Sequence, residues 1–132
     1  MKRYGILNRD ILNAVGSLGH ADRIVISDAG LPIPKEVSRI DLSVTKGIVP
    51  FFDVLRPMLE EVVVEKVILA KEIKKNSPDI HRQILDMVGK IPVEYVSQEE
   101  FKKLSHDAKA IIRTGQCTPY TNIMLQIGVD FS

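Results

Sequence analysis

Apolar residues recur along the chain with two periods that alternate. Short runs rich in β-branched residues are typical of buried strands, whereas apolar residues three and four positions apart are typical of amphipathic helices. The strand-like runs cover residues 23–27, 40–44, 62–70, 93–96, 109–114 and 123–129. The helix-like segments cover residues 8–18, 51–61, 77–88 and 97–104. This alternation predicts an α/β fold, namely a single three-layer α/β/α domain over residues 1–132 with a central mixed sheet, and leaves open which strands are parallel.

Several residues at the ends of the predicted helices favour these boundaries. Asn8 is a suitable N-cap for the first helix, and Gly19 is expected to end it in a left-handed conformation. Ser77–Pro78 provides an N-cap followed by proline at the first helical position. Ser97–Glu100 matches a capping box. Pro57, by contrast, is expected to kink or shorten the helix at 51–61.

Composition narrows the class of protein. The 132 residues are 45% apolar and 27% charged, which fits one folded domain. The 18 basic and 17 acidic residues leave a net charge of +1, so no basic excess exists for binding nucleic acid or an anionic membrane. The single cysteine, Cys117, excludes an internal disulfide and zinc sites built on several cysteines.

No segment predicts export or membrane insertion. The polar run 8–10 follows the first basic residues before a signal-peptide core can form. The longest apolar run, 62–70, is interrupted by Glu65 and Lys66 and is shorter than the roughly 20 residues that a membrane helix needs. We therefore expect a cytoplasmic protein in a reducing compartment.

Two loops follow predicted strands and contain polar groups. Ligands of open α/β sheets bind beyond the carboxyl ends of the strands, which selects residues 28–34 and 115–122. Glycine and proline stiffen both loops, and a stiff loop can hold hydrogen-bonding groups in the fixed geometry that sugar recognition requires. The chain contains no phosphate-binding loop, dinucleotide fingerprint or serine nucleophile motif, and no metal-ligand spacing beside these loops. We expect neither a cofactor nor a metal.

The residues that could carry chemistry also have structural explanations. Histidine titrates near neutral pH, so His20 is a candidate for proton transfer, although it also fits a capping or surface residue. Asp28 is either a functional acceptor or a turn residue. Tyr120 and Asn122 could simply satisfy loop backbone groups. Cys117 is a nucleophile only if a histidine lies beside it. These residues alone predict a small α/β protein with a His–Asp acid/base site.

The order of several short motifs resembles one known family. The motifs are Gly5–Asn8, Leu18–Asp22, Asp28–Pro34, Arg39–Leu42, Ala70–Lys74, Ala110–Gly115, Pro119–Asn122 and Gly128–Val129. They span nearly the whole chain, and together they resemble the ribose pyranase and fucose mutarotase family. The loop Ala29–Pro34 favours the ribose branch, because the fucose branch has an Ala-His-Phe-Pro pattern there.

This resemblance implies an isomerase that needs no cofactor and interconverts the β-pyranose and β-furanose forms of D-ribose. It implies that His20 is the proton donor. The sugar-binding residues that it implies are Asp28, Tyr120, Asn122, the backbone of Thr121 and, more weakly, Lys102. One departure concerns Gln98, which stands where the family often has a histidine that contacts the substrate. Glutamine cannot titrate, so we expect Gln98 to position the sugar without moving a proton.

The resemblance also implies a ring-like homo-oligomer, a pentamer or decamer, with sites near subunit contacts. Val129 and Phe131 are apolar residues that could pack on a neighbour. Three alternatives to the ribose isomerase are considered. The first is a mutarotase for another monosaccharide such as L-fucose, and the second is a non-catalytic sugar-binding or transport-accessory module. The third is a hydrolase that uses Cys117.

Overall fold

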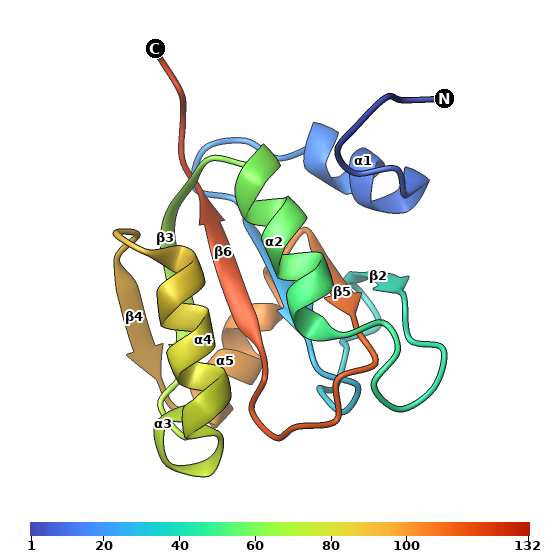
Figure 1. Ribbon diagram of the computed structural model, residues 1–132. Coiled ribbons are helices and arrows are strands. Elements are labelled where there is room, and N and C mark those ends of the chain that lie inside the picture. The colour runs from blue at the N-terminus through green and yellow to red at the C-terminus, as the bar shows by residue number, and fades with distance from the viewer.

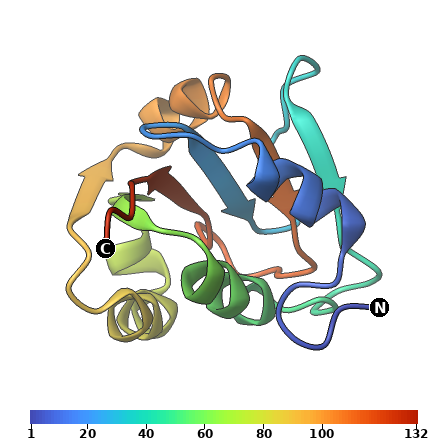
Figure 2. The same ribbon diagram turned by 90° about the horizontal axis from the view of Figure 1, so that it is seen from above.

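A six-stranded sheet runs through the centre of the molecule, and helices cover both of its faces (Figures 1 and 2). The computed structural model describes residues 1–132. The strands are β1 (Arg23–Ser27), β2 (Ser38–Asp41), β3 (Val64–Ala70), β4 (Val93–Val96), β5 (Ala110–Arg113) and β6 (Ile123–Ile127). The helices are α1 (Arg9–Gly16), α2 (Phe51–Glu61), α3 (Ile73–Asn76), α4 (Pro78–Val88) and α5 (Gln98–Ser105).

The strands lie in the order β2-β5-β1-β6-β3-β4, and β6 alone runs against the others. Strand β1 pairs in parallel with β5, β5 with β2, and β3 with β4, whereas β6 is antiparallel to both of its neighbours. The predicted mixed sheet is therefore confirmed. Five strands end at one edge of the sheet, which we call the carboxyl edge, and β6 begins there (lower edge in Figure 1). The opposite edge is called the amino edge.

Apolar side chains pack on both faces of the sheet. Along β1, Ile24 and Ile26 belong to a large cluster shared with α1, α2 and α4, while Val25 belongs to a smaller cluster under α5. Such burial on both faces explains the continuous apolar run of this strand. Phe101 anchors α5 in the smaller cluster with no exposed surface. The predicted three layers are present, with α5 on one face and the other helices on the opposite face (Figure 2).

Most predicted elements are found, but several details of the prediction are wrong. Strand β3 begins two residues later than expected and β6 ends two residues earlier. Helix α1 ends at Gly16 with Ser17 as its C-cap, because the Gly19 N–H donates to the Asp22 carboxylate instead of closing the helix. Strand β2 covers residues 38–41 rather than 40–44, since its partner β5 offers only four residues for pairing. Helix α2 is not shortened and continues through Pro57 to Glu61. The single turn α3 was not predicted.

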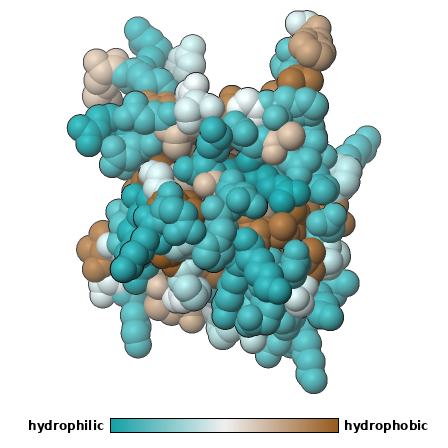
Figure 3. All heavy atoms as spheres, turned by 180° about the vertical axis from the view of Figure 1, so that it is seen from behind, coloured by the Kyte–Doolittle hydropathy of each residue, from teal (hydrophilic) through white to brown (hydrophobic).

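The outer surface beside α5 is mostly hydrophilic, with apolar atoms showing between the polar side chains (Figure 3). None of the helices combines the length and the hydrophobicity that crossing a membrane would require.

Candidate functional site

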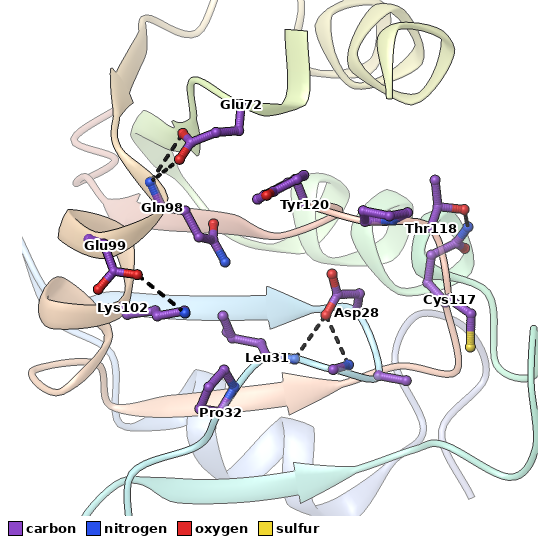
Figure 4. A pocket seen from close by; sticks show the side chains of 14 residues that line it. Asp28, Leu31, Pro32, Glu72, Gln98, Glu99, Lys102, Cys117, Thr118 and Tyr120 are labelled. Atoms are coloured by element: carbon purple, nitrogen blue, oxygen red, sulfur yellow. Dashed lines mark hydrogen bonds and ion pairs between the residues drawn. The ribbon is translucent and has the colours of Figure 1, made fainter. Parts of the chain in front are cut away.

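A pocket of about 680 Å³ opens at the carboxyl edge of the sheet. The loop after β1, the residues after β3, the start of α5 and the loop between β5 and β6 form its walls. Figure 4 shows the side chains of Asp28, Gln98 and Tyr120 facing the same space. The volume lies within the range of small-molecule sites, and both loops selected from the sequence contribute to it.

Asp28 lies at the inner end of the pocket with 8% of its surface exposed. Its Oδ1 accepts hydrogen bonds from the backbone N–H groups of Gly30 (3.0 Å) and Leu31 (2.9 Å). The turn after β1 therefore fixes the carboxylate in one orientation. Burial raises the pKa of Asp28 above its usual value, and the hydrogen bonds from the backbone and from Asn122 offset part of this shift.

Asn122 and Thr121 lie behind the pocket rather than in its lining, and they are almost completely buried. Asn122 Oδ1 accepts the Asp28 backbone N–H at 2.9 Å, and Asn122 Nδ2 donates to Asp28 Oδ2 at 3.3 Å. The Thr121 backbone also donates to Asp28. In this chain, both residues thus act on the pocket through Asp28.

Tyr120 projects into the pocket from a constrained loop. Its φ of 61° lies in the left-handed region, which costs a non-glycine residue on the order of 1–3 kcal/mol. The loop is held on one side by Ser77 Oγ, which donates to the Pro119 carbonyl at 2.7 Å. Backbone strain of this kind is typical of residues that surrounding contacts hold in place for function.

Gln98 and Lys102 occupy one face of α5, four residues apart, and both line the pocket. As predicted, Ser97 caps this helix by accepting the Glu100 N–H. The Gln98 N–H donates to both carboxylate oxygens of Glu72, at 3.1 and 3.0 Å. Gln98 Oε1 is buried and has no hydrogen-bond partner. Lys102 forms an ion pair with Glu99 at 3.5 Å.

Glu72 lines the pocket and was not predicted from the sequence. Glu72 follows the end of β3 by two residues. The rule that selected the loops after β1 and β5 would also have selected this position, because β3 ends at the same edge of the sheet.

His20 does not reach the pocket of its own chain. It lies at the amino edge, where its Nε2 is 2.9 Å from Glu65 Oε1 and 60% of its side chain is exposed. The next residue, Ala21, has a φ of 70° and donates its N–H to the Ile127 carbonyl at the end of β6. The whole of β1 separates His20 from Asp28, and five residues of strand span about 17 Å.

Cys117 is exposed at the mouth of the pocket, where its Sγ contacts the Gly115 carbonyl at 3.5 Å. The three histidines have other partners: His20, His81 and His106 bond to Glu65, Tyr95 and Glu36, respectively. No group of three or more His, Cys, Asp or Glu side chains lies close enough together to hold a metal ion. The geometry therefore lacks the base that a Cys117 nucleophile would need.

The fold and the pocket define an α/β protein with a polar small-molecule site at the carboxyl edge of a mixed sheet. The chain belongs to the RbsD / FucU transport protein family, whose sequence model matches residues 1–130. The D-ribose pyranase of Geobacillus thermodenitrificans is 50% identical over 132 residues, which cover all of both chains.

Solved structures are similar over nearly the whole fold. The structure of Bacillus subtilis RbsD complexed with D-ribose has a TM-score of 0.96 and 48% sequence identity, covering 99% of this chain and 100% of that one. The fucose mutarotase of Streptococcus pneumoniae in complex with L-fucose has a TM-score of 0.73 and 25% identity, covering 93% of this chain and 94% of that one. The chain is thus more similar to the ribose-bound protein than to the fucose-bound one.

Proposed function

We propose that this protein is an isomerase that interconverts β-D-ribopyranose and β-D-ribofuranose. The observation that carries the proposal is full-length similarity to D-ribose pyranases in a chain whose pocket holds a fixed, buried carboxylate at Asp28. The lower similarity to the fucose mutarotase makes L-fucose the less favoured substrate.

The reaction needs only proton transfers. Protonation of the ring oxygen breaks its bond to the anomeric carbon, and loss of the anomeric hydroxyl proton leaves an open-chain aldehyde. A different hydroxyl then attacks the aldehyde carbon, gives up its proton and closes the other ring, while the carbonyl oxygen takes up a proton. No electrons are transferred. One well-placed acid/base pair typically accelerates such steps by about 10²–10⁴-fold.

The residues of the pocket divide this work. The Asp28 carboxylate accepts a hydrogen bond from a sugar hydroxyl and keeps the sugar in one orientation. Tyr120, Gln98 and Lys102 offer further donors and acceptors around the same space. His20 is the proposed proton donor and returns to its starting state when it recovers the proton.

We further propose that His20 is supplied by a second copy of the chain, in a ring-like homo-oligomer. His20 is exposed at the amino edge, and the exposed apolar residues Val63, Val129 and Phe131 precede β3 or follow β6 at the same edge. An interface between the amino edge of one copy and the carboxyl edge of the next is heterologous, and such interfaces form a ring when the rotation from copy to copy closes. A pentamer, or a decamer of two pentamers, follows the family resemblance.

The test is saturation-transfer NMR on D-ribose with and without the protein. We expect faster exchange between the pyranose and furanose signals, and a smaller effect on L-fucose measured alongside. If the exchange rate of ribose is unchanged while ribose still binds, the protein is a sugar-binding or transport-accessory module instead.

The exposed thiol of Cys117 suits a reducing compartment, which supports a cytoplasmic location.

A further inference from the structure

Glu72 links two walls of the pocket that are distant in sequence. It follows β3, and it accepts the backbone N–H of Gln98, 26 residues further along, with both carboxylate oxygens. Gln98 is the first residue of α5, so its N–H is one of the donors that the helix itself cannot satisfy. Another of these donors, the N–H of Glu100, is already satisfied by Ser97. Glu72 therefore supplies a second cap from outside the helix.

A charged cap fixes the start of a helix more firmly than a neutral one. Hydrogen bonds to a carboxylate are stronger than those between neutral groups, and a negative charge at a helix N-terminus also interacts favourably with the helix dipole. Because the bond is made to the backbone of Gln98 itself, it limits where the side chain of that residue can lie.

The side chain of Gln98 has an unsatisfied hydrogen-bond acceptor. Its Oε1 is buried without a hydrogen-bond partner, and buried acceptors ordinarily have one. Figure 4 shows this side chain pointing into the pocket, between Tyr120 and Lys102. A sugar hydroxyl is a donor of the kind that this oxygen lacks.

We propose that Glu72 is a positioning residue for sugar binding. It holds the first turn of α5 so that a small rotation of the Gln98 side chain brings the unpaired Oε1 to a hydroxyl of the bound sugar, and Lys102 follows one turn later on the same face. The identity of the sugar rests on the proposed function, whereas the coupling between Glu72 and Gln98 is independent of whether the protein accelerates ring exchange.

A positioning role of Glu72 can be distinguished from a purely structural role by its effect on sugar affinity. Calorimetry should give a D-ribose dissociation constant about tenfold higher for Glu72→Ala, which corresponds to one lost hydrogen bond to a charged group. The rate at saturating ribose should change by less than about twofold, because the groups that transfer protons stay in place. Glu72→Gln should recover most of the affinity, since its amide oxygen still accepts one bond from Gln98. Glu100→Ala is the matched control, because Glu100 is an exposed acidic residue in the same helical turn and does not line the pocket.

A double-mutant cycle decides the mechanism. If Glu72 acts through Gln98, then Gln98→Ala should weaken binding by a similar factor, and the double variant should be no weaker than the single variants. Fully additive losses, or wild-type affinity in Glu72→Ala, would overturn the proposal. If Glu72→Ala does not fold, the same cycle with Glu72→Met and Gln98→Ala carries the test, because methionine keeps the length of the side chain but offers no oxygen to the Gln98 N–H. A wild-type protein that binds ribose without accelerating exchange would refute the proposed function and leave this affinity test intact.

Discussion

Two hydrogen bonds join Asp28, the residue after β1, to Asn122, the residue before β6. The backbone N–H of Asp28 donates to Asn122 Oδ1, and Asn122 Nδ2 donates to the Asp28 carboxylate. Both residues are buried, and 94 positions separate them in the sequence. Asn122 therefore holds the end of β1 and the carboxylate of the pocket at the same time.

Replacement of Asn122 by alanine should damage both stability and activity. It leaves the buried Asp28 N–H without an acceptor, which costs about 1–3 kcal/mol of the free energy of unfolding. Ring exchange should slow by about tenfold, because the carboxylate loses the hydrogen bond that orients its Oδ2, although the bonds from Gly30 and Leu31 to Oδ1 remain. Chemical denaturation and saturation-transfer NMR measure the two effects. Asn13→Ala, at an exposed position of α1, should change neither quantity; normal exchange in Asn122→Ala would argue against this role.

The pH dependence of binding should follow Asp28. Burial raises the pKa of this carboxyl, so it takes up a proton at a higher pH than an exposed aspartate would. The protonated group is a weaker acceptor for a sugar hydroxyl, and ribose affinity should therefore fall on acidification before exposed aspartates titrate. The contribution of Asp28 to folding stability changes with pH in the opposite direction to ribose affinity. Because the folded state binds the proton more tightly, the contribution of Asp28 to stability decreases as the pH rises from its unfolded pKa of 3.8 through its raised folded pKa.

Calorimetric titrations with ribose between pH 4 and 8 test the first expectation. In Asn122→Ala, the loss of a hydrogen bond that lowers the pKa of Asp28 should move the acid limb to higher pH. An acid limb that stays in the same place in this variant would show that another group controls it.

Gly115 lies where the pocket loop meets the segment 47–49. A Cβ on Gly115 would overlap the backbone of Ile48. Two backbone hydrogen bonds join the segments: the Gly47 N–H donates to the Gly115 carbonyl, and the Gly115 N–H donates to the Val49 carbonyl, each with a donor–acceptor distance of 2.7 Å. Gly115→Ala should therefore destabilise the fold by about 1–3 kcal/mol and weaken ribose binding, because the loop has to move. Gly16→Ala is the matched control, because a Cβ at this position would have no atom within 4 Å. Its melting temperature should not fall. Equal melting temperatures for both variants would contradict the contact.

The sequence predicts elements well where burial and turns are both strong. Strands β1 and β4 match the expected ranges residue for residue, because their apolar runs end in abrupt polar or glycine-rich turns. The end of β2 is less predictable, since it depends on how many residues its partner β5 offers. Helix α2 continues through Pro57 because its packed residues, among them Leu55 and Met58, are fully buried.

The candidate site is only partly visible in the sequence. The rule for carboxyl ends finds Asp28 and Tyr120, because each follows or precedes a recognisable strand. The contact between Asp28 and Asn122 depends on the pairing of β1 with β6, which periodicity does not reveal. The separation of His20 from the pocket could have been predicted from the sequence, however. One predicted strand separates it from Asp28, and the two ends of a strand lie at opposite edges of a sheet.

The distance between His20 and Asp28 predicts complementation between two inactive variants. His20→Ala keeps the pocket and loses the proton donor, whereas Asp28→Asn keeps the donor and damages the pocket. In an oligomer with heterologous interfaces, a His20→Ala pocket beside an Asp28→Asn neighbour is complete. Random mixing in equal amounts should make about one site in four complete and restore about a quarter of the wild-type exchange rate. The measurement is saturation-transfer NMR on coexpressed, differently tagged chains purified through both tags. Each variant purified alone provides the baseline. Mixed oligomers that exchange ribose no faster than this baseline would place His20 outside the reaction or within its own chain's site.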